Sequence, residues 1–158
     1  MRRTATMSVI AAAALGITIS GCAKDGAPEG MTVVALEGLP GLEAWVPNGT
    51  KVSKNAVGIG VMLAGPGVSM TVGRALDVDA ATLEQAEENA QAYAATNLEP
   101  RTLPDGYILT YENVGSTGTN YWLVGRRELE GTAYSCGVSS PKKEHQQSAV
   151  AICESLKK

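Results

Sequence analysis

The sequence predicts an α+β fold, with an antiparallel sheet of about six or seven strands, one central helix and one C-terminal helix. Short apolar runs alternate with turns rich in Gly and Pro, and only two segments show the 3.6-residue period of a helix. The predicted strands also follow one another without the helical crossovers that parallel pairing needs. The predicted order is four strands, a helix, three strands and a final helix.

The first four predicted strands are separated by turn residues. Gly38-Leu39-Pro40-Gly41 ends the first strand, Pro47-Asn48-Gly49 ends the second, and Gly65-Pro66-Gly67 joins the third and fourth as a hairpin. After the central helix, three more apolar segments are bounded by Gly-containing turns. The seven predicted strands cover residues 32–36, 42–46, 57–64, 68–75, 107–114, 120–128 and 132–138.

Two segments carry helical signals. The central helix is predicted from Asp79, a good N-cap, to Asn97, which Pro100 follows. The C-terminal helix is predicted to start at Ser140-Pro141, an N-cap followed by Pro, and to run to about Leu156. Each has an apolar stripe at helical spacing, so each is expected to pack against the sheet.

The N-terminus has the layout of a secretory signal. Arg2 and Arg3 precede an uncharged segment whose apolar centre covers residues 7–19. We therefore divide the chain into a signal peptide (1–21), a flexible tether (22–31) and a single α+β domain (32–158).

The end of this segment reads Ile19-Ser20-Gly21-Cys22 and resembles the lipobox of bacterial lipoproteins. The resemblance implies cleavage before Cys22 and acyl chains on that residue, which would hold the protein on a membrane of the cell envelope. Ala23 follows in place of the Asp that marks inner-membrane retention in some bacteria, which favours the outer membrane where there is one. An ordinary signal peptide with a chance Cys and an uncleaved anchor are the alternatives.

The charge of the mature chain argues against a nucleic-acid partner. Removal of Arg2 and Arg3 lowers 13 Lys and Arg to 11, against 16 Asp and Glu, for a net charge of −5. One His, and Cys residues that have other predicted roles, also leave too few ligands for a common zinc site. We predict no metal site, no cofactor and no catalytic residues, and the oligomeric state stays open.

The order of elements and the closing pattern Tyr134, Cys136, Cys153-Glu154-Ser155-Leu156 resemble the PsbP-like family of α/β/α sandwiches. The resemblance covers most of residues 39–156. It implies a sheet covered by a central and a C-terminal helix, and it implies an accessory or partner-binding role. The family has no shared catalytic set that would carry over to this chain.

Cys136 and Cys153 are predicted to form a disulfide. Cys136 shares a strand face with Tyr134 and Val138, and Cys153 lies on the apolar stripe of the last helix. Export delivers the chain to an oxidising compartment, where such bonds persist. Two buried free thiols and a redox-active pair are the alternatives. A thiolate is disfavoured near a helix C-terminus, which makes the redox reading the weaker one.

Possible binding residues are aromatic or arginine side chains outside the apolar stripes. Neighbouring residues of a strand point to opposite faces, so each of two adjacent pairs is expected to have one inward and one exposed member. Aromatic and Arg side chains are enriched in binding hot spots. The candidates are Trp45, Tyr121, Trp122, Arg126 and Arg127. We predict a non-enzymatic, lipid-anchored envelope protein that binds a protein or envelope partner or assists assembly. A small-ligand carrier or small enzyme, with a cleft lined by Tyr93, Tyr111 and His145, is the alternative.

Overall fold

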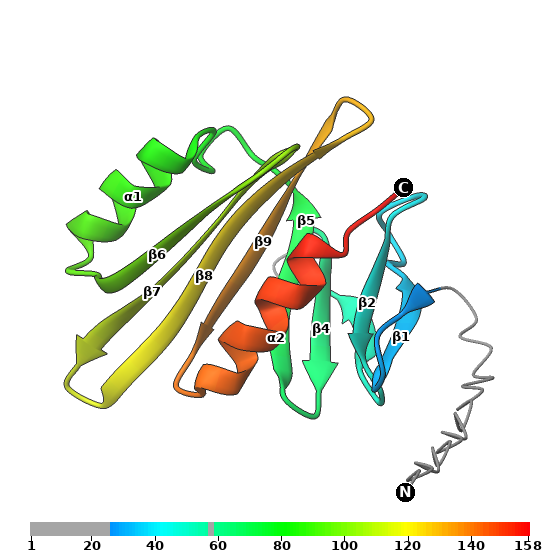
Figure 1. Ribbon diagram of the computed structural model, residues 1–158, viewed down its shortest axis with the longest axis horizontal. Helices are drawn as coiled ribbons and strands as arrows, with labels where there is room; N and C mark the ends of the chain where they lie inside the picture. The colour runs from blue at the N-terminus through cyan, green and yellow to red at the C-terminus, as the bar shows by residue number, and fades with distance from the viewer. Residues whose placement is uncertain (1–25, 57–58) are drawn as a thin grey trace, which may run out of the picture.

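A seven-stranded antiparallel sheet forms the centre of the computed structural model, which describes residues 26–56 and 59–158 (Figure 1). A separate two-stranded sheet and two helices complete it, so the predicted α+β class is confirmed. The strands are β1 (Met31–Ala35), β2 (Glu43–Pro47), β3 (Lys51–Lys54), β4 (Val61–Gly65), β5 (Val68–Arg74), β6 (Thr96–Leu103), β7 (Gly106–Gly115), β8 (Gly118–Leu129) and β9 (Thr132–Ser140). The helices are α1 (Leu83–Ala92) and α2 (Lys143–Glu154).

The large sheet is built from two antiparallel meanders that meet at one pairing. Its strand order is β3-β4-β5-β9-β8-β7-β6, and every pair is antiparallel. Tight turns join most neighbours. Pro66-Gly67, for example, connects β4 to β5, with Gly67 at a φ of 68° that glycine adopts without steric cost. The connection from β5 to β6 contains α1 and crosses from one meander to the far edge of the other.

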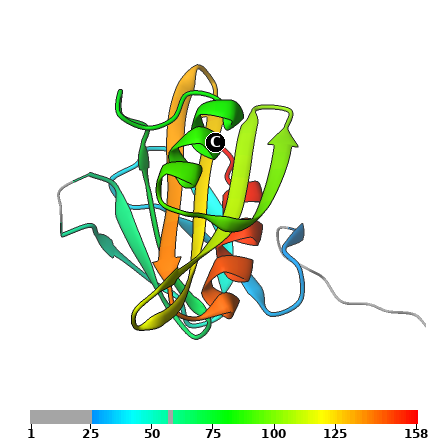
Figure 2. The same ribbon diagram turned by 90° about the vertical axis from the view of Figure 1, so that its left-hand side faces the viewer.

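The two helices lie on opposite faces of this sheet (Figure 2). Ile108 of β7 packs in the same core cluster as Ile152 of α2, whereas its neighbour Leu109 packs with Ala86 and Ala90 of α1. Because successive side chains of a strand point to opposite faces, α1 and α2 must cover different faces. We call these the α1-side face and the α2-side face.

The α2-side face is the more completely covered one. Helix α2 lies over β5, β8 and β9, and the hairpin β1–β2 packs beside α2 in the same core cluster (Figure 1). Leu42, Ala44 and Val46 from this hairpin segment are buried. On the other face, the strands that α1 packs against are β6 and β7. The α1-side face over β4, β5 and β9 therefore has no helix above it.

Several predicted boundaries are wrong. The structure adds β3, which is almost wholly polar, and β6, whose first two residues lie in the segment predicted as the end of the central helix. Helix α1 begins after Thr82, whose hydroxyl accepts from the Gln85 backbone N–H, so Asp79 is not its N-cap. Helix α2 begins at Lys143, and Ser140 ends strand β9.

Candidate functional site

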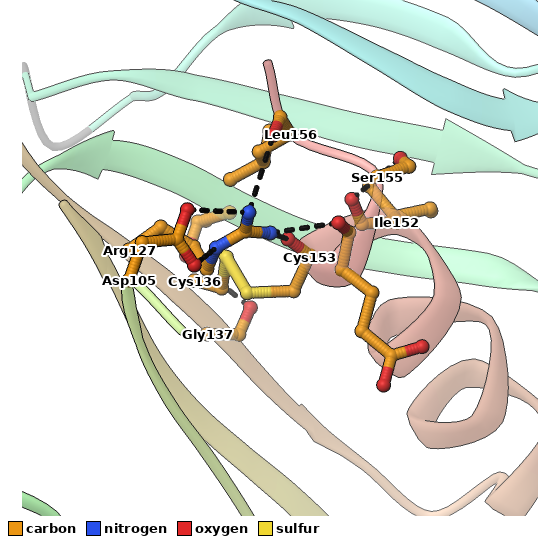
Figure 3. The surroundings of a disulfide bond; sticks show 10 residues. Asp105, Arg127, Cys136, Gly137, Ile152, Cys153, Ser155 and Leu156 are labelled. Carbon is orange, nitrogen blue, oxygen red and sulfur yellow. Dashed lines mark hydrogen bonds and ion pairs between the residues drawn. A yellow bond between two sulfur atoms is a disulfide. The ribbon is translucent and has the colours of Figure 1, made fainter. Parts of the chain in front are cut away.

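The Cys136–Cys153 pair joins the sheet to α2 beneath the C-terminal end of the helix (Figure 3). Cys136 lies on β9 and Cys153 in the last turn of α2, and their sulfur atoms are 2.15 Å apart, at disulfide distance. Both residues are buried in the core cluster of the α2-side face. The position matches the sequence prediction, because strand alternation and helical period both turn these side chains inward.

Arg127 holds the same end of α2 by hydrogen bonds. Its Nε and Nη2 donate to the two carboxylate oxygens of Asp105, at 2.8 Å each. Nη1 donates to the carbonyl oxygens of Cys153 and Glu154, and Nη2 also reaches that of Leu156 (Figure 3). The last carbonyls of a helix lack partners within the helix and carry its negative dipole end, so a cation there is favourable.

The environment of this pair also sets the ionisation of Asp105. Hydrogen bonds from the Arg127 guanidinium lower the pKa of the Asp105 carboxyl, and partial burial opposes this effect. Arg127 itself is only 8% exposed. Its donors are therefore engaged in holding the fold, and it is not part of an exposed binding surface.

Trp45 and Tyr121 also lie on the α2-side of the molecule. Trp45 is half-buried on β2, and its backbone N–H donates to the Ser155 hydroxyl at 2.9 Å. Tyr121 of β8 is half-buried, with the Lys143 ammonium 5.7 Å from its ring centroid. Tyr121 lies near the start of α2 and Trp45 near its end, so these two aromatic residues form no common patch.

Trp122 and Arg126 point to the α1-side face. The indole of Trp122 stacks on the Tyr111 ring, with 5.8 Å between centroids and 4° between planes. Tyr111 is buried beside α1, and burial raises its pKa. Trp122 thus stands at the boundary between the part of the sheet that α1 covers and the part that it leaves open.

The open part of the α1-side face forms a groove, which we call the β5–β9 groove. It consists of two adjoining hollows, of about 350 and 220 Å³, that share Thr71, Val124 and Gly137 in their floor. Trp122 lines the first hollow and Arg126 the second. The structure therefore brings together Trp122 and Arg126 from the five predicted binding residues, and it leaves out Trp45, Tyr121 and Arg127.

One end of this groove has an apolar rim. Ile59 and Leu76 line a further hollow that shares Thr71 and Ser135 with the groove, and they are 47% and 43% exposed. Val78, two residues beyond Leu76, is 84% exposed. These three residues were not singled out from the sequence, because strand and loop patterns do not show that two distant loops meet at one end of a sheet.

The remaining predictions concern the lipobox, His145, metal binding and membrane-spanning helices. Cys22 and the other lipobox residues are outside the described residues. His145 is half-buried on α2, with its Nδ1 2.9 Å from the Ser140 hydroxyl oxygen. Within residues 26–56 and 59–158, there is no cluster of His, Cys, Asp and Glu suited to a metal ion, and no helix is long and apolar enough to cross a membrane.

Comparison with known proteins adds no relative to these observations. No protein-family model matches the chain, and no curated protein matches its sequence.

Proposed function

We propose that the chain is a non-enzymatic, lipid-anchored protein of the bacterial cell envelope, which docks a partner protein on the β5–β9 groove. The anchor is the part of this proposal that the sequence supports: a charged start, an apolar segment and Ile19-Ser20-Gly21-Cys22. Acyl chains on Cys22 would hold the domain at the membrane, and two or more such chains give stable anchoring.

The observation that carries the docking proposal is the uncovered half of the α1-side face. A two-sided sheet normally buries an apolar face against another layer, and here α1 covers only the β6–β7 half. The bare half combines a half-buried Trp122, the cation of Arg126 and a rim of exposed aliphatic residues. Aromatic and Arg residues beside exposed apolar side chains are the composition of a protein-binding surface.

The tether enters the domain at one end of the molecule. The hairpin β1–β2, which follows the tether, lies at one end of the long axis, and α1 lies at the other (Figure 1). Nine residue steps from Cys22 to Met31 span roughly 30 Å at most. An anchor at Cys22 would therefore keep the β1–β2 end within roughly 30 Å of the membrane.

The alternative of a cleft between the sheet and the central helix has less support. Tyr111 is buried against α1, Tyr93 is 71% exposed after the helix, and His145 lies on α2 across the sheet. The small side chains of Ala86 and Ala90 pack α1 closely on β7. These three polar residues therefore do not converge on one cleft among the described residues.

The test is site-specific photocrosslinking in intact cells from single positions of the full chain. Probes at Ser139 and Val78 report on the groove and its rim, and a probe at Glu37, which is exposed at the β1–β2 end, is the matched control. We expect one crosslinked partner from the two groove positions and not from the control position. Arg126→Glu should weaken this crosslink, while the chain keeps its melting temperature.

Two results would contradict the proposal. Equal crosslinking from Glu37 and Ser139 would mean that the groove is not the docking surface. A chain with Cys22→Ser that crosslinks as efficiently as the wild type, and stays with the membrane, would remove the lipid anchor from the proposal.

A further inference from the structure

A second cavity lies on the opposite face of the molecule from the β5–β9 groove. It has a volume of about 410 Å³ and opens between β6, β7 and α2, because α2 packs mainly over β5, β8 and β9 and contacts β7 only slightly. Volumes of roughly 300–1,000 Å³ are usual for small-molecule sites. We call it the β7–α2 pocket.

Two buried polar side chains form the inner wall of this pocket. Thr110 of β7 is 8% exposed and Gln146 of α2 is 7% exposed, and both line the cavity. Among the described residues, the Thr110 hydroxyl has no hydrogen-bond partner. The unpaired polar atoms that are fully enclosed among the described residues are the indole nitrogens of Trp45 and Trp122, so the Thr110 hydroxyl oxygen is not fully enclosed. Because Thr110 lines the pocket, its unpaired hydroxyl can meet a ligand there.

Gln146 is held by two hydrogen bonds to the sheet, and its side-chain oxygen forms none of them. Its Nε2 donates to the carbonyl oxygens of Tyr111 and Trp122, at 3.1 and 2.8 Å. The β6 strand shifts register between Thr96 and Glu99, opposite Tyr111, so the sheet is irregular beside this anchor point. Both amide hydrogens are thereby used, so Oε1 remains as an acceptor in a residue that, like Thr110, lines the pocket.

The same bulge arranges the mouth of the pocket. Asn97 has a φ of 53°, a conformation that Asn tolerates better than most residues, and its Nδ2 donates to Glu112 Oε2 at 2.9 Å. The other oxygen of Glu112 lies 3.5 Å from the Lys143 ammonium. Glu112 is therefore held from two sides, as a fixed part of the pocket wall.

The charges of the pocket favour a neutral ligand. Its lining contains two cations, Arg101 and Lys143, and two anions, Glu99 and Glu112, so they sum to zero. Both cations are already paired, Lys143 with Glu112 and Arg101 with Glu154. An anion would have to break one of these pairs to gain a cation. Ile108, Pro100 and Val150 add apolar wall between the polar groups.

We infer that the β7–α2 pocket binds a small, uncharged, hydroxyl-rich ligand of the saccharide class. A hydroxyl group both donates and accepts, so neighbouring hydroxyls can donate to Gln146 Oε1 and exchange a hydrogen bond with Thr110. The C–H faces of a sugar ring match the aliphatic wall. This site is separate from the proposed docking groove, and its test involves neither the partner nor the membrane anchor.

The experiment is ligand-observed saturation-transfer NMR on the full chain in a detergent without a sugar headgroup. The neutral probes are glucose, N-acetylglucosamine and their β-1,4-linked disaccharides, and the charged probes are glucuronate and glucosamine. We expect a saturable signal from at least one neutral saccharide and a weaker signal from every charged probe. No saturable signal from any neutral saccharide, or stronger binding of a charged probe, would overturn the inference.

Two variants locate the binding. Thr110→Val removes one hydroxyl at nearly constant volume and should raise the dissociation constant roughly five-fold. Gln147→Trp, at an exposed position on the wall of the pocket, should block the cavity and abolish the signal. The matched controls are Thr102→Val on β6 and Gln91→Trp on α1, both exposed and outside the pocket. Each variant is first checked by its melting temperature.

The outcome is decided by the blocking variant. Loss of the signal with Gln147→Trp and its retention with Gln91→Trp would support the site. Binding that survives Gln147→Trp, in a chain that melts like the wild type, would place the saccharide elsewhere and overturn the inference.

Discussion

Gly125 of β8 lies directly against the sulfur of Cys153, so closely that a Cβ atom at this position would stand 2.9 Å from Sγ. The same Cβ would lie 3.4 Å from the Cβ of Cys136. The absence of a side chain at Gly125 is therefore what lets the disulfide pass between the sheet and α2. Its backbone φ is ordinary, so space and not conformation requires glycine here.

The first prediction is that Gly125→Ala destabilises the domain by about 1–3 kcal/mol, the usual cost of overpacking a core. The measurement is chemical denaturation under oxidising conditions. Gly115→Ala is the matched control, because its Cβ would meet nothing closer than 3.9 Å. In a Cys153→Ala background the cost of Gly125→Ala should shrink. An unchanged cost there would mean that the sulfur is not what crowds this position.

The second prediction concerns the disulfide itself. Cys153→Ala should lower the melting temperature by about 10 °C, because a bond that closes a 17-residue loop contributes roughly 3 kcal/mol in the chain-entropy model. Differential scanning calorimetry with and without reductant measures it. Reductant should lower the melting temperature of the wild type and leave that of the variant unchanged. A variant that melts with the oxidised wild type would contradict the stabilising role.

The third prediction follows from Asp105 and Arg127. Because Arg127 lowers the pKa of the folded Asp105 carboxyl, the pair stabilises the fold above the unfolded pKa of about 3.9, and this contribution is lost as the pH falls through the folded value. Asp105→Asn should destabilise the domain at pH 7 and flatten the acid part of its stability curve. Urea denaturation between pH 7 and pH 2 measures both effects.

Asp77→Asn is the control for this prediction, since Asp77 is exposed and forms no ion pair among the described residues. It should leave the stability at pH 7 and the shape of the acid limb near those of the wild type. If Asp105→Asn behaves like Asp77→Asn, the Arg127 contacts to the helix carbonyls hold α2 without help from the carboxylate.

The fourth prediction tests the anchor. Cys22→Ser should release the chain from the membrane fraction, because serine cannot form the thioether through which the proposed lipid would be attached. Cell fractionation and immunoblotting measure the change. Cys153→Ser is the matched control, as it changes the same residue type within the domain, and it should stay with the membrane. A Cys22→Ser chain in the membrane fraction would favour an uncleaved apolar anchor.

The parts of the fold that the sequence predicted are those with a buried face. Alternation along β5 and β9 correctly placed Val68, Met70 and Val72 on one face of β5, and Tyr134, Cys136 and Val138 on one face of β9, because a half-buried strand repeats every second residue. Strands β3 and β6 escaped prediction because they are the two edges of the sheet. Edge strands carry charges and Pro that discourage pairing with other chains, and Lys51, Lys54 and Pro100 give them the composition of loops.

The candidate sites were predictable only in part, for a different reason. Adjacent residues such as Arg126 and Arg127 were expected to diverge, and they do, but local patterning does not tell which of the two is covered. That depends on α1 stopping over β7 and on Asp105 standing beneath Arg127, which are relations between distant segments. The β7–α2 pocket has the same origin, since its walls come from three elements and from a bulge opposite Tyr111.

The pairing of β5 with β9 has a consequence for how the chain matures. It joins residues as far apart as Thr71 and Gly137, 66 positions along the sequence, and it is the one seam between the β3–β4–β5 meander and the rest of the large sheet. If the chain is exported as proposed, the N-terminal meander would emerge first, and the edge of β5 would stay unpaired until β9 has crossed the membrane. Closure of the seam, followed by locking of α2, would be the final event of biogenesis.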